Sequence, residues 1–510
     1  MPLSVAIASA SQIAAAAGGR VAQEGGNAVD AAVAAALVNA CTEPGVCGLG
    51  AGGYVTAWPP NGDPVTLDGN IEMPGRGIVP ERLGTGGREI EMEYGGGVRT
   101  IVGPGSVGTP GAVSALGLAS QRFGRVPWAT AVEPAIDYAR EGFPLPQACY
   151  NYLIHSGDLI FAHSPDGRDA LYQPSGELKQ AGQLVHFHGL ADSLEAIARN
   201  GVDEFYRGDL ARQIADEVYG NGGILTLEDL AAYETIIRPA LTKPLQDWLV
   251  ATNPPPAIGG ATLVAMLLLM DSRPPERWSR TEVEQLINVQ EAVLKYRLDR
   301  LDLSEDRKAD TEALLALAAQ HDTEGLRRSA STVHTSAVDS DGLACAITLS
   351  AGYGSGVIPP GTGILLNNCL GELELNRRGL IAGEPGTRLP SNMAPTVARR
   401  GDGAVLAIGS PGADRITTAI LQTLVNFVYL GMPLEQAIDH PRAHVEFDGD
   451  EMCVAFERGL PVDELSVKSR CFDEKSMFFG GVGAALWHPR DGFTLAADSR
   501  RTGGTILVNK

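Results

Sequence analysis

Polar and apolar residues alternate along positions 331–338, and this two-residue period predicts a β-strand. The sequence Asp-Ser-Asp-Gly at 339–342 has the residue types of a tight turn, and positions 343–350 then form a short apolar run. Together these patterns predict a β-hairpin over residues 331–350. Thr332 stands at the start of its first strand.

Apolar residues at helical spacing predict several helices. Small apolar residues predict a helix over 9–24, and Asn27 can cap a second, alanine-rich helix over 27–37. Further predicted helical segments are 124–142, 192–199, 262–270, 281–300 and 414–425, with a partly helical connector over 308–328.

Two short motifs elsewhere are interpreted as structural. The glycine-rich segment 48–55 leads into a strand and lacks the Gly-Lys-Ser/Thr ending of a phosphate-binding loop. His186-Phe187-His188 is interpreted as an alternating strand in preference to a metal site. We therefore predict neither a metal nor a cofactor.

The amino-acid composition indicates how large a core the chain can form and which sign its net charge has. The 510-residue chain is 44% hydrophobic and 20% charged, which is enough apolar material for a large core in one or more domains. Its formal net charge of −21 repels nucleic acid and anionic membranes, so neither is expected as a partner. The excess of acidic residues is interpreted as a solvated surface.

Cysteine spacing and the N-terminus bear on the cell compartment. The seven cysteines are scattered without a Cys-x-x-Cys pair, so neither a disulfide framework nor a zinc site is indicated. Residues 1–8 carry no basic segment and lead into the first predicted helix, and no apolar run is long enough to span a bilayer. We expect no signal peptide and a cytoplasmic location, with export by an unusual route left open.

A threonine at the start of a buried strand becomes a strong nucleophile when the chain is cut just before it. Its freed α-amine, with a pKa of roughly 8, can accept the proton of its own hydroxyl. The preceding residues 324–331 are small, polar and basic, as expected for an exposed segment that can be cut. By itself this pattern also fits a hairpin that serves only as scaffold.

Several motifs together resemble the γ-glutamyltransferase family, whose members are self-cleaving N-terminal-nucleophile hydrolases. They occur in the order of the family and at nearly its spacing, and the resemblance covers almost the whole chain. The motifs are Thr332-Val333-His334, Gly354-Ser355-Gly356, Gly363-Ile364-Leu365-Leu366-Asn367-Asn368, Pro390-Ser391-Asn392-Met393-Ala394-Pro395-Thr396 and Gly409-Ser410-Pro411-Gly412.

The resemblance implies roles for four catalytic positions. Thr332 takes the place of the nucleophile, and Ser350 lies near a hydroxyl that supports it. Gly412 and Ala413 take the places of a Gly-Gly pair whose N–H groups stabilise the oxyanion. His334 is interpreted as structural, because the α-amine already supplies a base.

The resemblance also implies a substrate pocket, in which this chain departs from the family. Glu372 stands where an aspartate recognises the α-ammonium of the donor, and Ser391 and Asn392 stand where a Ser-Ser pair contacts its carboxylate. Asn70 replaces an arginine that pairs with that carboxylate, and Gly352 replaces an asparagine in a shortened loop. Without the family, Ser391 and Asn392 would be interpreted as a loop cap and Glu372 as a solvated carboxylate.

The resemblance implies an α/β fold, a four-layer αββα sandwich, made from a precursor cut into residues 1–331 and 332–510, which remain associated in one interleaved domain. The expected activity is hydrolysis or acyl transfer at γ-glutamyl or similar amide bonds of a small molecule. One alternative is a hydrolase of the same fold that acts on another small acid, either an amidohydrolase or a C–C bond hydrolase of specialised metabolism. A second alternative is an uncut, inactive binding protein.

Overall fold

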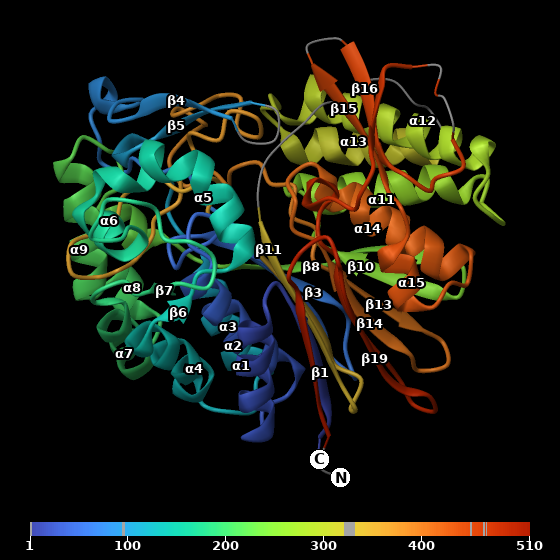
Figure 1. Ribbon diagram of the computed structural model, residues 1–510, viewed down its shortest axis with the longest axis horizontal. Coiled ribbons are helices and arrows are strands. Elements are labelled where there is room, and N and C mark those ends of the chain that lie inside the picture. The colour runs from blue at the N-terminus through green and yellow to red at the C-terminus, as the bar shows by residue number, and fades with distance from the viewer. Residues whose placement is uncertain are drawn as a thin grey trace.

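The computed structural model describes residues 3–93, 97–320, 332–448, 451–462, 465 and 467–509. Two antiparallel sheets lie face to face between two layers of helices (Figure 1), so the expected four-layer αββα architecture is confirmed. In spatial order, the first sheet consists of β20 (Gly504–Val508), β1 (Val5–Ser9), β11 (Val333–Asp339), β12 (Ala344–Ser350), β2 (Gly52–Trp58), β3 (Val65–Gly69) and β8 (Ile236–Pro239). The second consists of β19 (Gly492–Ala497), β18 (Gly483–His488), β14 (Val405–Gly409), β13 (Thr396–Arg400), β10 (Trp248–Thr252) and β9 (Leu241–Leu245).

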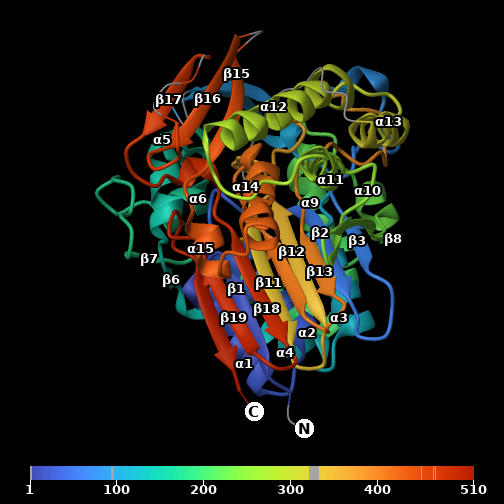
Figure 2. The same ribbon diagram turned by 90° about the vertical axis from the view of Figure 1, so that its right-hand side faces the viewer.

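Helices cover the outer face of each sheet (Figure 2). The layer on the first sheet, with the peripheral helices beside it, contains α1 (Gln12–Gln23), α2 (Ala28–Thr42), α3 (Ala112–Phe123), α4 (Trp128–Glu141), α5 (Gln147–Ile160), α6 (Pro165–Leu171), α7 (Leu190–Asn200), α8 (Asp203–Tyr206), α9 (Asp209–Gly220) and α10 (Leu227–Ala232). The layer on the second sheet contains α11 (Ile258–Asp271), α12 (Arg280–Tyr296), α13 (Arg307–Ala319), α14 (Arg415–Leu424) and α15 (Leu434–Asp439), with π-helical turns at Arg297–Leu301 and Val425–Tyr429.

Smaller sheets lie at the periphery. They are β4 (Arg88–Met92) with β5 (Val98–Val102), β6 (Phe143–Pro144) with β7 (Leu184–Val185), and β15 (Ala443–Asp448) with β16 (Glu451–Glu457) and β17 (Ser469–Phe472). Within the described ranges, no helix combines the length and apolar character that crossing a membrane requires.

The predicted hairpin is confirmed as β11 and β12, which pair antiparallel from Val333–Leu349 to Val338–Ala344. Both strands are fully buried because sheet and helices enclose them on the two sides. The predicted cut segment 324–331 lies outside the described residues. What the structure does place is Thr332, which is 2% exposed at the buried start of β11.

The helix caps also follow the sequence. Asn27 caps α2, and Asp30 completes a reciprocal capping box with it. The helix is apolar nearly all round, as expected for one buried between α1, α4 and the first sheet. Its alanines allow close packing on β11 and β12.

Two sequence expectations are wrong. Val5–Ser9 is a strand paired with β11 and β20, where we expected only a lead into a helix; its small apolar residues fit a fully buried strand equally well. The segment around His186 leaves the sheet after Val185, so it is not an alternating strand. His188 instead lies 3.0 Å from Asp169 across an exposed surface.

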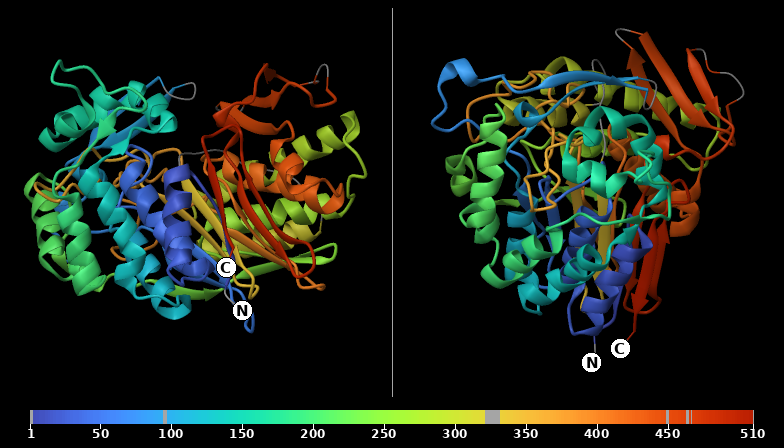
Figure 3. Two further views of the ribbon diagram at one scale, coloured as in Figure 1. Left: turned by 60° about the horizontal axis from the view of Figure 1, so that its bottom comes forward. Right: turned by 60° about the vertical axis from the view of Figure 1, so that its left-hand side comes forward.

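Strands from both sides of Thr332 alternate in the two sheets. In the first sheet β1, β2, β3 and β8 precede Thr332, whereas β11, β12 and β20 follow it. The second sheet combines β9 and β10 with four later strands. Figure 3 shows this interleaving as neighbouring blue, yellow and red strands. Small apolar side chains such as Ala6, Ala346 and Ala407 pack between the sheets and bring them close together.

Candidate active site

Thr332 lies one residue beyond the Val333–Leu349 pair, opposite the end of β12. It lines a small cavity together with residues that follow β3, the end of β12, residues 389–393 and Ile416 of α14. The strand ends of β11 and β12 therefore place a buried hydroxyl at a defined point.

Five other residues singled out from the sequence line the same cavity. They are Asn70, Ser350, Glu372, Ser391 and Asn392. Gly412 and Ala413 do not line it, but Asp414 beside them bonds to Asn392. The structure thus gathers candidates from positions that are more than 300 residues apart in the chain, although their roles stay predictions.

His334 is held by hydrogen bonds at both ring nitrogens. Its Nδ1 lies 2.8 Å from Oγ1 of Thr348, and its Nε2 lies 2.7 Å from Oγ of Ser336. Ser336 donates its own proton to the Gly483 carbonyl at 3.1 Å, so it accepts from Nε2–H. Burial lowers the pKa of His334 to about 3, which keeps the ring neutral. These contacts are those of a structural histidine.

Glu372 is the acidic residue among the described residues that line the cavity. Burial raises its pKa to about 8, with further contributions from Glu374 and Asp414. Gly352 stands close to it with φ of 62°, and a Cβ at that position would lie 3.0 Å from Oε2 of Glu372 and 2.4 Å from Oδ1 of Asn368. A side chain at position 352 would therefore collide with Asn368 and crowd Glu372, and the positive φ also favours glycine.

Asn70 points its side chain at the backbone of the cavity wall. Its side-chain Nδ2 donates to the backbone carbonyl of Leu389 at 2.8 Å. The backbone carbonyl of Asn70 accepts from the Tyr233 hydroxyl at 2.7 Å. The neighbouring Arg388 is engaged by Asp68 and Glu72, below the Tyr233 ring. None of the described residues that line the cavity is a lysine, arginine or histidine.

A buried charge network connects this cavity to the turn after β14. Asp414 accepts from Asn392 Nδ2 at 2.9 Å and from Arg297, which extends from the π-helical turn Arg297–Leu301. Arg297 is 1% exposed and also binds Asp302 through Nε at 3.0 Å and Nη2 at 3.2 Å. Asp414 is thereby fixed by a helix from the part of the chain before Thr332.

The turn itself presents unpaired backbone donors. Gly412 and Ala413 have φ of 122° and 67°, so both lie in the left-handed region. Their carbonyls accept from Arg415 and Ile416, whereas their N–H groups donate to no described residue. N–H groups without a described partner that precede a helix can donate to an anion, and these two lie outside the described lining of the Thr332 cavity. The positive φ of Ala413 is unfavourable for a residue with a Cβ, so the backbone is strained at this position.

We predict that Ala413→Gly stabilises the protein. Left-handed alanine carries about 1–2 kcal/mol of strain, and the entropy that glycine adds to the unfolded chain offsets about 0.5–1 kcal/mol of the relief. The midpoint of chemical unfolding should therefore rise slightly, measured in a Thr332→Ala background. The control Ala419→Gly, inside α14, should lower it by the usual helix propensity. A lower midpoint for Ala413→Gly would contradict the strain.

Several contributors were missed from the sequence alone. Arg297, Asp302 and Asp414 belong to no motif, because their contact depends on how the π-helical turn Arg297–Leu301 lies against the turn before α14. The apolar lining residues were missed too, since they resemble ordinary core residues. They are Ile71, Leu375, Leu389, Met393 and Ile416, beside Cys369 and Pro390.

A four-layer αββα sandwich with a threonine at the buried start of a central strand defines an N-terminal-nucleophile hydrolase. The sequence model for gamma-glutamyltranspeptidase matches residues 14–508. The chain therefore belongs to the γ-glutamyltranspeptidase family, and it is an enzyme of the hydrolase and acyltransferase class.

Relatives and solved structures agree with this assignment. A glutathione hydrolase proenzyme of Escherichia coli is 31% identical over 87% of this chain and 81% of its own length. The Acylase ACY 1 proenzyme of Pseudomonas sp. strain SE83 is 28% identical over 98% of this chain and 92% of its own. The cephalosporin acylase of Bacillus halodurans has the same fold, with a TM-score of 0.80 at 24% identity over 99% of this chain and 95% of its own.

Proposed function

We propose that this protein cuts its own chain before Thr332 and then uses the freed threonine to cleave amide bonds of small acyl donors. The observation that carries the proposal is the shared cavity, in which Thr332 meets Ser350, Glu372 and Ser391. Proenzyme names among the relatives support a precursor that is processed. The interleaved strands support two parts that remain associated after the cut.

Self-cleavage would begin with attack of the Thr332 hydroxyl on the carbonyl carbon of residue 331. The peptide C–N bond breaks as an ester forms, and the Thr332 nitrogen takes up the proton to become a free α-amine. Water then hydrolyses the ester and restores the hydroxyl. One side chain thus serves as nucleophile for maturation and for turnover.

In turnover, the α-amine of Thr332 accepts the hydroxyl proton while the oxygen attacks the donor carbonyl. The N–H groups of Gly412 and Ala413 are the proposed oxyanion donors, since no described residue occupies them. The α-amine then protonates the leaving amine, and an acyl-enzyme remains. Water or an acceptor amine releases the acyl group.

The cavity lining suggests which donor fits. Glu372 can pair with an ammonium, whereas no described lining residue offers a cation to a carboxylate. Ser391 and Asn392 offer only neutral polar groups. We therefore propose a donor whose amino group matters more than its α-carboxylate, such as a γ-glutamyl amide held mainly at its ammonium.

Three anilides test this specificity directly. γ-Glutamyl-4-nitroanilide carries both groups, its α-carboxamide lacks the carboxylate, and glutaryl-4-nitroanilide lacks the amine. Loss of the carboxylate should lower kcat/KM less than about tenfold, and loss of the amine about a hundredfold, as expected for a buried charged pair. The reverse order would contradict the proposed pocket.

We predict a pH dependence that belongs to Glu372. Its carboxyl group must lose its proton to pair with the donor ammonium, and its pKa is raised to about 8 by burial, Glu374 and Asp414. Dividing kcat/KM for the γ-glutamyl donor by that for the glutaryl donor cancels the titration of the Thr332 α-amine. This ratio should rise about tenfold per pH unit below pH 8, level off there, and fall again once the donor amine itself loses its proton.

Two variants isolate the carboxylate responsible. In Glu372→Gln the ratio should be small and independent of pH. In Glu374→Gln the rise should persist but move to lower pH, because Glu374 helps to raise the pKa of Glu372. A wild-type ratio that does not change with pH would rule out the ammonium role of Glu372.

A second candidate, an amidase for neutral or acidic acyl groups, is favoured by the apolar side chains of Ile71, Leu389 and Met393 in the cavity. The acylase relatives support it. A protonated Glu372 would then donate a hydrogen bond to an acyl oxygen. Preference for the glutaryl donor at pH 6 would identify this activity.

A further inference from the structure

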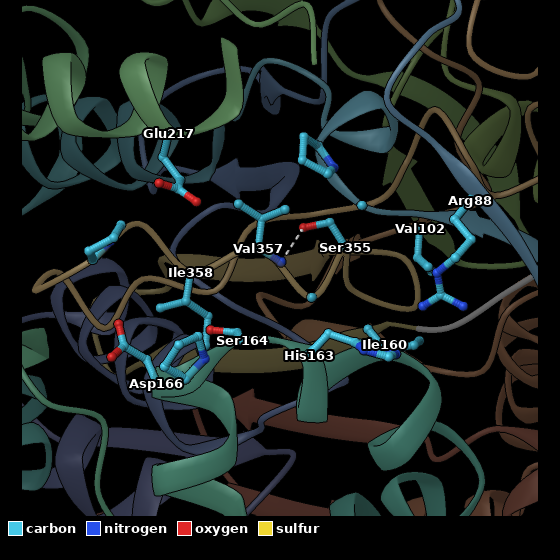
Figure 4. A pocket seen from close by; sticks show the side chains of 15 residues that line it. Arg88, Val102, Ile160, His163, Ser164, Asp166, Glu217, Ser355, Val357 and Ile358 are labelled. Carbon is cyan, nitrogen blue, oxygen red and sulfur yellow. Dashed lines mark hydrogen bonds between the residues drawn. The ribbon is translucent and has the colours of Figure 1, made fainter. Parts of the chain in front are cut away.

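A second and larger cavity lies apart from the Thr332 pocket. Its volume is about 350 Å³, and it shares none of its lining residues with the first cavity. The end of β5, the segment joining α5 to α6, helix α9 and residues 355–360 surround it (Figure 4). Ligand pockets in proteins begin at about this size.

Charged groups of opposite sign face this cavity from different sides. Figure 4 shows Asp166 and Glu217 on one side and Arg88 on the other, with Ser355 and Val357 between them. Among the described residues, none of these three charged side chains forms an ion pair. Opposite charges that share a cavity without pairing leave room for a ligand that carries both signs.

The remaining contacts of these side chains are few. Arg88 donates Nη2 to the Leu159 carbonyl at 2.6 Å, and its other guanidinium nitrogens have no described partner. Glu217 accepts from Asn221 Nδ2 at 2.9 Å through one carboxylate oxygen. Burial raises the pKa of Glu217, and the nearby Asp166 raises it further, so a cation between the two carboxylates would relieve their repulsion.

Apolar side chains line much of the cavity, and the hydroxyl of Ser355 is already hydrogen-bonded. Val102, Ile160, Val357 and Ile358 line it. Ser355 donates to the Leu366 carbonyl at 2.9 Å and accepts from Val357 N–H at 3.1 Å. The centre of the cavity therefore suits a short carbon backbone or small side chains, with charges only at the ends.

We propose that this cavity binds a small zwitterion, an α-amino acid or dipeptide, with its ammonium between Asp166 and Glu217 and its carboxylate at Arg88. The cavity volume of about 350 Å³ falls in the range of small-molecule pockets, which suits a ligand of this size. The site goes beyond the proposed function, because it contains no residue of the Thr332 pocket. Its lining comes from both sides of Thr332, so the ligand would contact both parts of the chain.

Isothermal titration calorimetry of the purified, active protein tests this with three probes. L-Alanyl-L-alanine carries both charges, its N-acetyl form lacks the ammonium, and its C-terminal amide lacks the carboxylate. We expect binding of the first, and at least about tenfold weaker binding of the other two, as expected for loss of a charged hydrogen bond. Equal binding of all three, or no binding of the first at millimolar concentration, would overturn the proposal.

Surface variants locate the site. Arg88→Gln and Asp166→Asn should each weaken L-alanyl-L-alanine about tenfold or more, without loss of fold, since Arg88 is exposed and Asp166 is half-buried. Arg99→Gln on the adjoining strand and Asp169→Asn on the same helix lie outside the cavity and should bind normally. If Glu372→Gln abolishes binding and Arg88→Gln does not, the dipeptide occupies the Thr332 pocket and the proposed site is wrong.

Discussion

Replacing Thr332 by alanine is expected to leave the 510-residue chain in one piece and without amidase activity. The hydroxyl at this position is the proposed attacking group in both reactions. It lies next to Val333, the first residue of β11, and lines the cavity. Loss of a nucleophile of this kind lowers turnover by a factor on the order of 10⁵–10⁶. Intact-mass spectrometry after incubation shows the cut directly, since the wild type should give a fragment that begins at Thr332.

Thr335→Ala is the matched control for this substitution. Thr335 lies on the same strand but on its opposite face, where its hydroxyl meets Ser9 and Asn39 beneath the helices. This variant should lose some stability and still be cut. Thr332→Ser should be cut as well, since it keeps a hydroxyl. A wild-type chain that stays uncut would leave the family fold without its chemistry and favour the alternative of a binding protein.

Replacing Arg297 by methionine is expected to lower both stability and turnover. It leaves Asp302 and Asp414 buried without their cation, and removal of one partner of such a network costs about 3–5 kcal/mol. Asp414 then no longer fixes Asn392 and the turn at Gly412 and Ala413. Misplaced oxyanion donors lower kcat by a factor of about 10² to 10³.

Arg297→Lys keeps the charge and should therefore fold better than Arg297→Met. Lysine cannot reach Asp302 with two parallel bonds while also binding Asp414, so kcat should still fall while KM changes less. Arg300→Met, on the exposed side of the same π-helical turn, should leave kcat and the unfolding midpoint unchanged. If Arg297→Lys has wild-type kcat, Arg297 is a structural residue that does not position the turn.

The parts of the structure that the sequence predicts correctly are those with local signals. The alternation of polar and apolar residues around Thr332 predicts a strand because successive side chains of a strand point to opposite faces of the sheet. The motif around Ser391 locates one wall of the cavity because its residues are adjacent in the chain. The same holds for the cap at Asn27, where side chain and backbone meet within one turn.

The parts that could not be predicted depend on contacts between distant elements. Nothing near Arg297 in the sequence indicates Asp414, which meets it because the π-helical turn Arg297–Leu301 lies against the turn before α14. Val5–Ser9 forms a strand because β11 and β20 flank it, although its composition fits a helix as well. The position of Asn70 was predicted, but its bond to Leu389 was not.

Because strands from before and after Thr332 alternate in the sheets, the cut and the uncut chain should refold differently. If the backbone is cut before Thr332 as proposed, β11 and β12 still lie between β1 and β2, so neither part can leave without breaking a central ladder of hydrogen bonds. Loss of association and loss of structure then become one event. An uncut chain should refold at a rate independent of its concentration, whereas the cut enzyme must first bring two molecules together, so dilution after denaturation should prevent its recovery.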